Sequence, residues 1–335
     1  MRLGSIFLFV ALCSFTAYYI YEPIPEEIEE RWKLMLTNSF FRSLSHLADL
    51  SELLGLKDYM GVMYFITLAE KVVPVSDEHV KVTEEKFDGV EVVLYQPQQR
   101  GGTELRRAII YLHGGGWCLG SSRMSPYDLL ARKMVTELDS VVLSVEYRLA
   151  PAHHFPVPYE DVYRVVKHFL QKGVLAQYSV DPGRIAVSGD SAGGNLAAAV
   201  SQQNQDMPIL PRTLMVRFWS EYFTSDKALF RAMMANTHNN PESSSLLKFV
   251  NWSAFLPETY HKKYNYSAPA VVGMDGPSRS FADPRASPLL VPDTALHSLP
   301  KAYVLTWLMF TVWPTDFLIA RRMTDNYVKW LKENL

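Results

Sequence analysis

A serine flanked by small residues lies at the centre of the stretch RIAVSGDSAGGNLAAAV, residues 184–200. Gly189 and Gly193 stand two positions to either side of Ser191, which matches the G-x-S-x-G spacing of a sharp strand-to-helix turn. Glycines there leave room for a strained serine backbone, and the turn presents the hydroxyl for attack on a carbonyl carbon. The alternative is an ordinary glycine-containing turn with a serine cap. An apolar run before the serine and an alanine-rich run after it favour the nucleophile.

A second glycine cluster, His113-Gly114-Gly115-Gly116-Trp117, follows the apolar run RAIIYL. Consecutive glycines let backbone N–H groups approach a bound oxygen with no β-carbon in the way, so this cluster predicts an oxyanion-binding loop. The alternative is a flexible loop. The start of the helix after the serine would add further N–H donors and the positive end of its dipole.

Buried strands and amphipathic helices alternate around these two motifs. The expected strands cover residues 107–112, 140–147 and 184–190, and the expected helices cover residues 125–138, 159–172 and 192–203. An antiparallel hairpin, HVKVTEEKFDGVEVVLYQP, precedes them and turns at Asp88-Gly89. The alternation predicts an α/β fold with a mostly parallel sheet covered by helices on both faces. Ligands bind beyond the carboxyl ends of such strands, so both glycine motifs should face one site.

The N-terminal segment is uncharged from residue 3 to residue 21, which is long enough to span a bilayer. Arg2 precedes it and five glutamates follow it by residue 30, so the charge bias places the N-terminus in the cytosol and the remainder in the lumen. A cleaved signal peptide is the alternative. It is disfavoured because bulky Phe15, Tyr18 and Tyr19 occupy the region where cleavage requires small residues.

The remaining chain is expected to form one catalytic-type domain behind a helical cap. Apolar residues recur at helical spacing between about residues 28 and 73. We therefore divide the chain into an anchor at 1–21, a helical cap at 22–80 and a hydrolase-type domain at 81–335.

Composition limits the classes of partner. The net charge of −2 offers no basic surface for nucleic acid, and no metal-ligand cluster or nucleotide-binding fingerprint is visible, so we expect no cofactor. Of the two cysteines, Cys13 lies in the anchor, which leaves Cys118 without an internal disulfide partner in the folded domain. Glycosylation sequons at Asn251 and Asn265 fit a lumenal location.

The segments HGGGW, YRLAPAHHFP and GDSAGGN together resemble the hormone-sensitive-lipase-like branch of the α/β-hydrolases. The segments YYIYEPIPEEIEE, ELLGL, RFWSEYF, LLKFVNWS and YVKWLKENL are similar to the arylacetamide deacetylase group of that branch. This resemblance implies a membrane-anchored serine esterase of the endoplasmic reticulum lumen. Its substrates would be esters and arylamides of small lipophilic compounds.

The resemblance also implies a role for individual residues. Ser191 would be the nucleophile, and Gly115, Gly116 and Ala192 would donate backbone N–H groups to the oxyanion. His113 would belong to the oxyanion loop, together with Gly114, and would not be the catalytic base.

The sequence departs from this family near the C-terminus, where the catalytic acid and then the histidine should follow the serine. Residues 307–311 read WLMFT in place of the acid motif, and no histidine follows His297. Residues 204–213, NQDMPILPRT, stand where the family has a further strand. We therefore expect internal deletions near 204–213 and 307–312, an incomplete sheet, and no catalytic acid or histidine.

Other residues are poor replacements. His238, His261 and His297 follow the serine, and the latter two lie in polar, surface-type segments. His153 and His154 belong to a family segment that packs the oxyanion loop, and Asp316 is more simply a helix cap. Two hypotheses follow: a serine carboxylesterase or deacetylase, and an inactive membrane-anchored protein that at most binds lipophilic acyl compounds.

Overall fold

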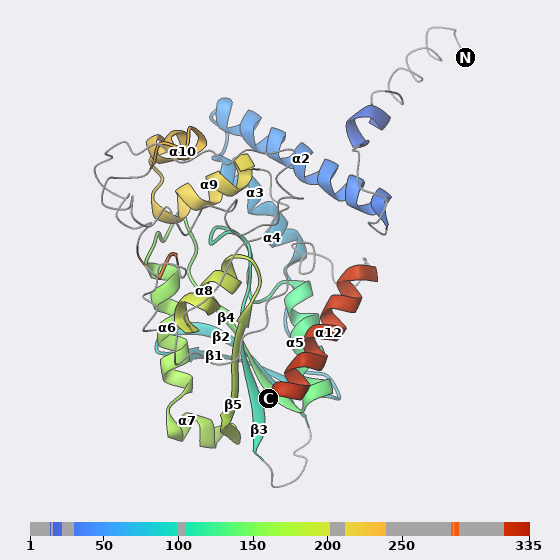
Figure 1. The fold of residues 1–335 in the computed structure, drawn as a ribbon, viewed down its shortest axis with the longest axis vertical. Helices are drawn as coiled ribbons and strands as arrows, with labels where there is room; N and C mark the ends of the chain where they lie inside the picture. Colours follow the sequence, from blue (N-terminus) through green and yellow to red (C-terminus); the bar gives the residue numbers. More distant parts are fainter. Residues whose placement is uncertain are drawn as a thin grey trace, which may run out of the picture.

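A five-stranded mixed sheet forms the centre of the protein (Figure 1). The computed structural model describes residues 14, 16–21, 30–98, 105–201, 212–238, 283, 285–287 and 318–335. The strands are β1 (Val80–Phe87), β2 (Val90–Pro97), β3 (Arg106–Leu112), β4 (Ser140–Glu146) and β5 (Val180–Gly189).

The strand order is β1-β2-β4-β3-β5. The β1–β2 and β2–β4 pairs are antiparallel, whereas β4, β3 and β5 are parallel to one another. The predicted α/β architecture is confirmed, and the parallel part of the described sheet is the part that leads into both glycine motifs. The predicted hairpin is also confirmed, because Asp88 (φ 50°) and Gly89 (φ 84°) both adopt the left-handed conformation that a tight two-residue turn needs.

Helices cover both faces of the sheet (Figure 1). On one face, Ile109 and Tyr111 of β3 pack in a cluster with α5 (Ser125–Leu138) and α12 (Leu318–Asn334). On the other face, Ile110 and Leu112 join a cluster with α6 (Val157–Phe169), α7 (Lys172–Gln177) and α8 (Ala192–Ser201). Successive strand residues point to opposite faces, and both faces are buried, which explains the uninterrupted apolar run of β3.

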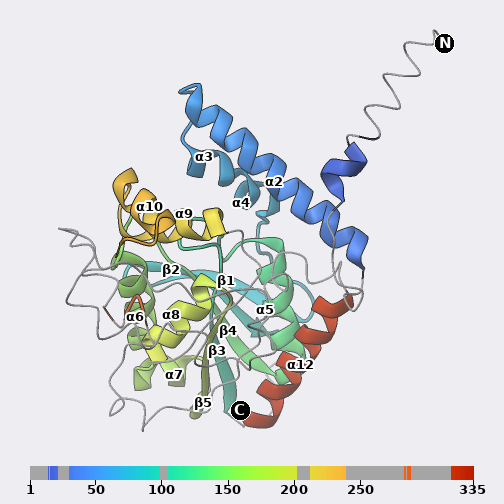
Figure 2. The ribbon, with the colours of Figure 1, turned by 45° about the horizontal axis from the view of Figure 1, so that its top comes forward.

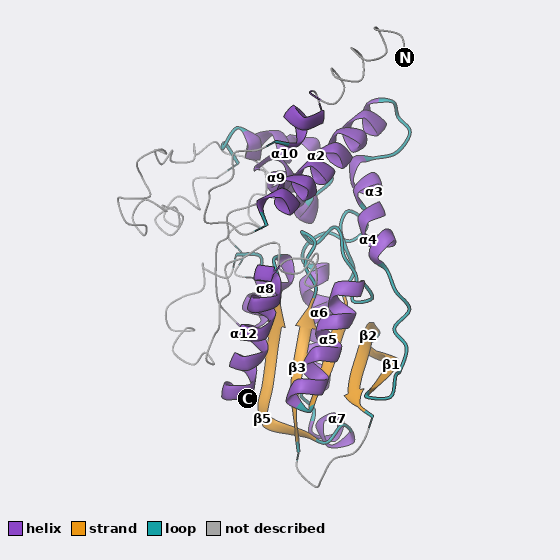
Figure 3. Ribbon diagram, turned by 90° about the vertical axis from the view of Figure 1, so that its right-hand side faces the viewer, coloured by secondary structure: helices purple, strands orange, loops and turns teal. Residues whose placement is uncertain are grey.

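A group of helices lies beyond the carboxyl ends of β3, β4 and β5 (Figures 2 and 3). It comprises α2 (Arg31–Leu53), α3 (Tyr59–Met63), α4 (Phe65–Glu70), α9 (Arg212–Phe223) and α10 (Lys227–Met234). Arg217 of α9 links these helices, because its guanidinium lies 2.5 Å from Glu52 and 3.7 Å from the centre of the Tyr59 ring. The described helices between residues 31 and 70 therefore lie, together with α9 and α10, at the end of the sheet that carries the glycine motifs.

Several sequence predictions lie outside the described residues. They concern most of the proposed anchor, both sequons, the segments 202–211 and 307–312, His261, His297 and Asp316. Residues 16–20 are helical, and none of the described helices is both long and apolar enough to cross a bilayer. In the described part of the chain, α8 is followed by helix α9 rather than by a further strand.

A buried carboxylate supports the segment after β4. Asp161 of α6 is fully buried and accepts hydrogen bonds from Arg148 Nε (2.8 Å) and Nη2 (2.7 Å), and Arg164 also contacts it. Burial acts to raise the pKa of Asp161, but the hydrogen bonds from Arg148 outweigh it and hold the pKa below its usual range. Ala150 lies two residues after Arg148, and its N–H donates to the Trp117 carbonyl at 2.9 Å. The ion pair between Arg148 and Asp161 therefore also supports the predicted oxyanion loop.

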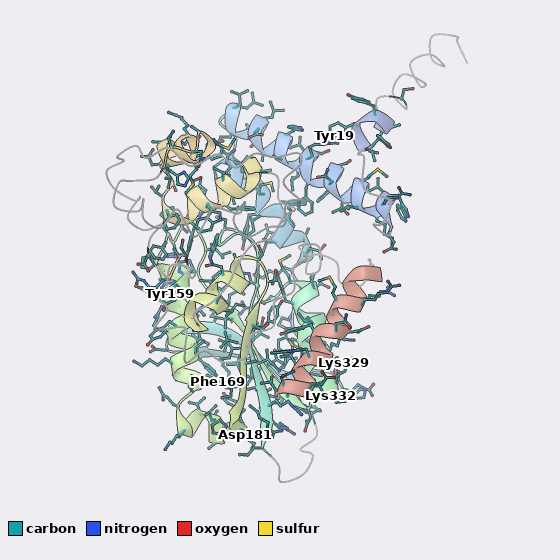
Figure 4. The ribbon with its side chains drawn as sticks, viewed as in Figure 1. Tyr19, Tyr159, Phe169, Asp181, Lys329 and Lys332 are labelled. Atoms are coloured by element: carbon teal, nitrogen blue, oxygen red, sulfur yellow. The ribbon has the colours of Figure 1, made fainter. Side chains whose placement is uncertain are left out.

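We predict that Asp161→Asn lowers the free energy of unfolding by about 2 kcal/mol, because it removes charge-assisted hydrogen bonds to a buried group. Denaturant unfolding of the purified protein, followed by circular dichroism, measures the change. Asp181→Asn is the control, since Asp181 pairs with Arg184 at the end of the sheet opposite the cap (Figure 4) and should lose less. Equal losses in the two variants would contradict the structural role of Asp161.

Candidate active site

Ser191 occupies a sharp turn between β5 and α8. Its φ of 50° is in the left-handed region, which few residues other than glycine adopt, and the residue is exposed. The Gly193 N–H donates to the Asp190 carbonyl at 2.8 Å, and the Asn195 N–H donates to the Ser191 carbonyl at 3.0 Å, which starts the helix. This is the strained strand-to-helix turn that the G-x-S-x-G spacing predicts.

The two flanking glycines let this turn pack directly on the end of β3. A β-carbon at Gly189 would lie 2.5 Å from the Leu112 carbonyl oxygen. A β-carbon at Gly193 would overlap the same oxygen and the carbonyl oxygen of His113. The serine turn and the start of the glycine loop are therefore in backbone-to-backbone contact.

Two glycines of the loop adopt conformations that other residues rarely take. Gly115 has a φ of 114° and Gly116 has a φ of 62°. A β-carbon at Gly115 would overlap the Leu119 carbonyl, and one at Gly116 would overlap the ring of Phe218, which belongs to α9. The loop is thus enclosed by its own chain on one side and by α9 on the other.

Three backbone N–H groups remain available around the serine. Among the described residues, the N–H groups of Gly115, Gly116 and Ala192 donate no hydrogen bond. The Gly114 N–H differs, because it donates to Asp190 Oδ1 and to the Tyr127 hydroxyl, each at 3.0 Å. Unpartnered N–H groups on a glycine loop and at a helix start are the donors that stabilise a developing oxyanion.

Asp190 joins the serine turn to the loop. Its Oδ1 accepts from the Gly114 N–H and, at 3.2 Å, from the Tyr111 hydroxyl, while Oδ2 accepts from the Tyr127 hydroxyl at 3.2 Å. Burial, reinforced by the charge of Asp190, raises the pKa of Tyr111 far above its usual value, so this hydroxyl remains a donor. Asp190 therefore fixes the position of Gly114 relative to Ser191.

His113 forms part of the wall behind the loop. Its ring is fully buried and stacks on Tyr147 with ring centres 4.2 Å apart, and the Tyr147 hydroxyl donates to the His113 carbonyl at 2.6 Å. Burial lowers the pKa of His113, so the neutral ring donates from Nδ1 to the Gly114 carbonyl at 2.8 Å. The buried His113 ring is therefore held within the loop by its own backbone and by Tyr147.

Glu146 was not singled out by the sequence motifs, although it also supports this region. It accepts from the Ser122 N–H at 2.7 Å and from the Ser121 hydroxyl at 2.8 Å. Burial acts to raise the pKa of Glu146, whereas the hydrogen bonds from Ser122 and Ser121 lower it, and the pKa lies below its usual value. The sequence signal that could have identified Glu146 is its position as the single acidic residue at the end of the apolar strand SVVLSVE, because a buried charge requires a polar partner.

No base can be assigned from the described residues. Within them, the Ser191 hydroxyl has no hydrogen-bond partner. His154 is engaged with α9, where its Nδ1 lies 2.6 Å from the Glu221 carbonyl. Burial lowers the pKa of His238.

We predict that Gly193→Ala lowers the free energy of unfolding by about 3 kcal/mol, because the added β-carbon meets backbone atoms of β3 that cannot move aside. Thermal or denaturant unfolding measures the loss. Gly173→Ala in α7 is the control, since a β-carbon there meets nothing within 4 Å and alanine should stabilise the helix by about 0.5 kcal/mol. A Gly193→Ala protein as stable as the unmodified chain would show that the turn does not pack on β3.

Comparisons with known proteins agree with this architecture. A family model described as the α/β-hydrolase fold matches residues 109–329. Arylacetamide deacetylase of Oryctolagus cuniculus is 45% identical over 325 residues, which cover 87% of this chain and 81% of that protein. Among solved structures, the ester hydrolase EH1AB1 from the metagenome of Lake Arreo has a TM-score of 0.51 at 19% identity, covering 87% of this chain and 97% of its own, and supports the fold alone.

A further comparison concerns length. Neutral cholesterol ester hydrolase 1 of Bos taurus is 35% identical in an alignment that takes in 99% of this chain and 100% of that protein. The alignment is 410 positions long and this chain has 335 residues, so at least 75 positions of the relative have no counterpart here. That these gaps lie near 204–213 and 307–312 stays a prediction. From its fold, its motifs and these relatives, the chain belongs to the α/β-hydrolase family, in the group that includes the arylacetamide deacetylases.

Proposed function

We propose that this chain is a serine hydrolase of the carboxylesterase and deacetylase class, with Ser191 as its nucleophile. The observation that carries the proposal is the set of unpartnered N–H groups at Gly115, Gly116 and Ala192, on two segments that pack against each other beside the serine. The substrate class is the ester or amide of a small lipophilic compound. The names of the arylacetamide deacetylase and cholesterol ester hydrolase relatives support this class.

The proposed reaction proceeds through an acyl-enzyme. The Ser191 hydroxyl attacks the substrate carbonyl, and the three N–H groups stabilise the negative charge that forms on its oxygen. Collapse of this intermediate breaks the bond to the leaving group, which takes up the proton that the serine hydroxyl gave up and departs as the alcohol or amine, while the acyl group stays on the serine oxygen. Water then attacks the acyl-enzyme and releases the acid.

The rate of this chain depends on the base that removes the serine proton. Relatives of this fold place the acid and the histidine after the serine, and the histidines there are His238, His261 and His297. We assign none of them as the base. A serine triad without its base retains about 10³- to 10⁴-fold acceleration over water, supplied by the oxyanion hole and by binding. We therefore expect slow turnover at about that level.

A second candidate function is an inactive protein that binds lipophilic acyl compounds without hydrolysing them. The specific observation in its favour is that no histidine follows His297, where the family motif requires one. This candidate and the first predict the same fold and the same oxyanion donors. They differ in whether Ser191 reacts.

The proposed location is the membrane of the endoplasmic reticulum, with residues 3–21 as a single-pass anchor and the folded domain in the lumen. The uncharged length of that segment, Arg2 before it and the glutamates after it support this orientation. The sequons at Asn251 and Asn265 are the glycosylation sites that a lumenal domain would carry.

We predict that a fluorophosphonate probe labels the detergent-purified chain and does not label Ser191→Ala. Hydrolysis of p-nitrophenyl butyrate should exceed the buffer rate by about 10³- to 10⁴-fold and should disappear in the same variant. Gel fluorescence and absorbance measure the two effects. If the chain and Ser191→Ala behave alike in both assays, the binding protein is the correct interpretation.

We further predict that Asp190→Ala slows probe labelling by about 10²-fold, because a loop displaced by about 1 Å no longer aligns its donors with the serine. Asp190→Asn should be intermediate, since its Oδ1 still accepts from the Gly114 N–H. Labelling rates are compared with thermal unfolding of the same samples. Unchanged labelling in Asp190→Ala would refute a positioning role for this carboxylate.

A further inference from the structure

A row of apolar side chains lies exposed along α2. At 100° per residue, Trp32, Leu36, Phe40, Leu47, Leu50 and Leu54 fall within about 80° of one another around the helix axis. We call these six residues the apolar stripe. Their exposed fractions lie between 47% and 61%. At 1.5 Å per residue the stripe is about 33 Å long.

The stripe reverses the usual burial of an amphipathic helix. Helical spacing of apolar residues normally indicates a face that packs on the core. In α2, the fully buried Ala48 lies about 120° from the centre of the stripe, whereas the buried Ser39 lies at the edge of the stripe and the half-buried Ser43 lies within it, at the contact with Tyr19. Single exposed apolar residues are common, whereas several exposed apolar residues along one side of a helix mark a protein-binding or membrane-binding surface.

The N-terminal segment contacts the same helix. The Arg42 guanidinium lies 4.4 Å from the centre of the Tyr19 ring and donates to the Tyr19 carbonyl, and the Ser43 hydroxyl lies 3.3 Å from the Tyr19 hydroxyl. Figure 4 shows Tyr19 where the N-terminal helix meets α2. The uncharged run of residues 3–21 therefore ends against the helix that carries the stripe.

Exposed aromatic residues lie beside Tyr19 in sequence and at the N-terminal end of the stripe. Tyr18 and Tyr21 are 82% and 69% exposed, and Trp32 begins the stripe. Tyrosine and tryptophan concentrate at membrane–water interfaces, where their rings lie at the level of the lipid headgroups. Their position between an uncharged spanning-length segment and an exposed apolar helix identifies the bilayer surface as the occupant, in preference to another protein.

The charges of α2 indicate which lipids are involved. The helix carries three basic residues and two acidic residues, so it lacks the lysine- and arginine-rich face that draws interfacial helices to anionic lipids. We propose that the apolar stripe of α2 lies in the headgroup region of a bilayer of neutral phospholipid. The proposal rests on the membrane anchor set out under the proposed function.

This orientation would turn the end of the sheet that carries Ser191 toward the membrane. The cap helices lie beyond the carboxyl ends of β3, β4 and β5, and the serine turn follows β5 (Figure 3). Small lipophilic substrates partition into bilayers. The enzyme would therefore face the phase in which its proposed substrates are concentrated.

The test uses the full chain in phosphatidylcholine vesicles, with nitroxide labels read by electron paramagnetic resonance. Leu47→Cys places the label on the stripe, and Asp49→Cys places a matched label about 160° away on the same helix. Both carry Cys13→Ser, while Cys118 is 3% exposed and is left in place. Accessibility to oxygen relative to a nickel chelate gives the membrane depth parameter. We expect a positive depth parameter at position 47, a negative one at position 49, and no change when phosphatidylserine is added.

Each alternative outcome overturns the proposal in a distinguishable way. Flotation with the vesicles together with a negative depth parameter at position 47 would leave the anchor in place and refute the contact. Failure to float would refute the anchor and the contact together. Spin–spin broadening at position 47 would assign the stripe to a second copy of the chain. Thermal unfolding of both labelled variants should match that of the unlabelled chain, which shows that a change in folding does not decide the result. Ser191 labelling by the fluorophosphonate probe tests the proposed reaction separately.

Discussion

The site depends on one contact between backbones, in which the serine turn rests on the carbonyl groups at the end of β3. Glycines at 189 and 193 allow this approach, because the space that a β-carbon would need is occupied by the Leu112 carbonyl. With the two segments in contact, the carboxylate of Asp190 reaches the Gly114 N–H and fixes the glycine loop. The positions of the three available N–H groups follow from that arrangement.

The rest of the structure supports this contact from several directions. α9 closes over Gly116 through Phe218, Tyr147 stacks on His113, and the segment fixed by Asp161 bonds to Trp117. These supports come from parts of the chain that are distant in sequence. A loop rich in glycine has high conformational entropy, so a defined geometry requires such enclosure.

Local features were predictable from the sequence, whereas features that depend on distant partners were not. The Asp88-Gly89 turn and the strained turn at Ser191 follow from residue types within a few positions. By contrast, Asp190 bonds to Gly114 across 76 residues, and the pairing of β2 with β4 is also set by tertiary contacts. Periodicity predicted helices between about residues 28 and 73, including the region of Trp32, Leu36 and Leu47, which lie on one side of α2. It did not show that this side is exposed.

Recognition by main-chain amides has an evolutionary consequence. The groups at Gly115, Gly116 and Ala192 belong to the peptide backbone, so side-chain replacements elsewhere in the chain leave their chemistry intact. Proton transfer, by contrast, relies on side chains that a deletion removes outright. Affinity for an acyl carbonyl and the speed of its hydrolysis therefore rest on different parts of the chain, and a change in one need not alter the other.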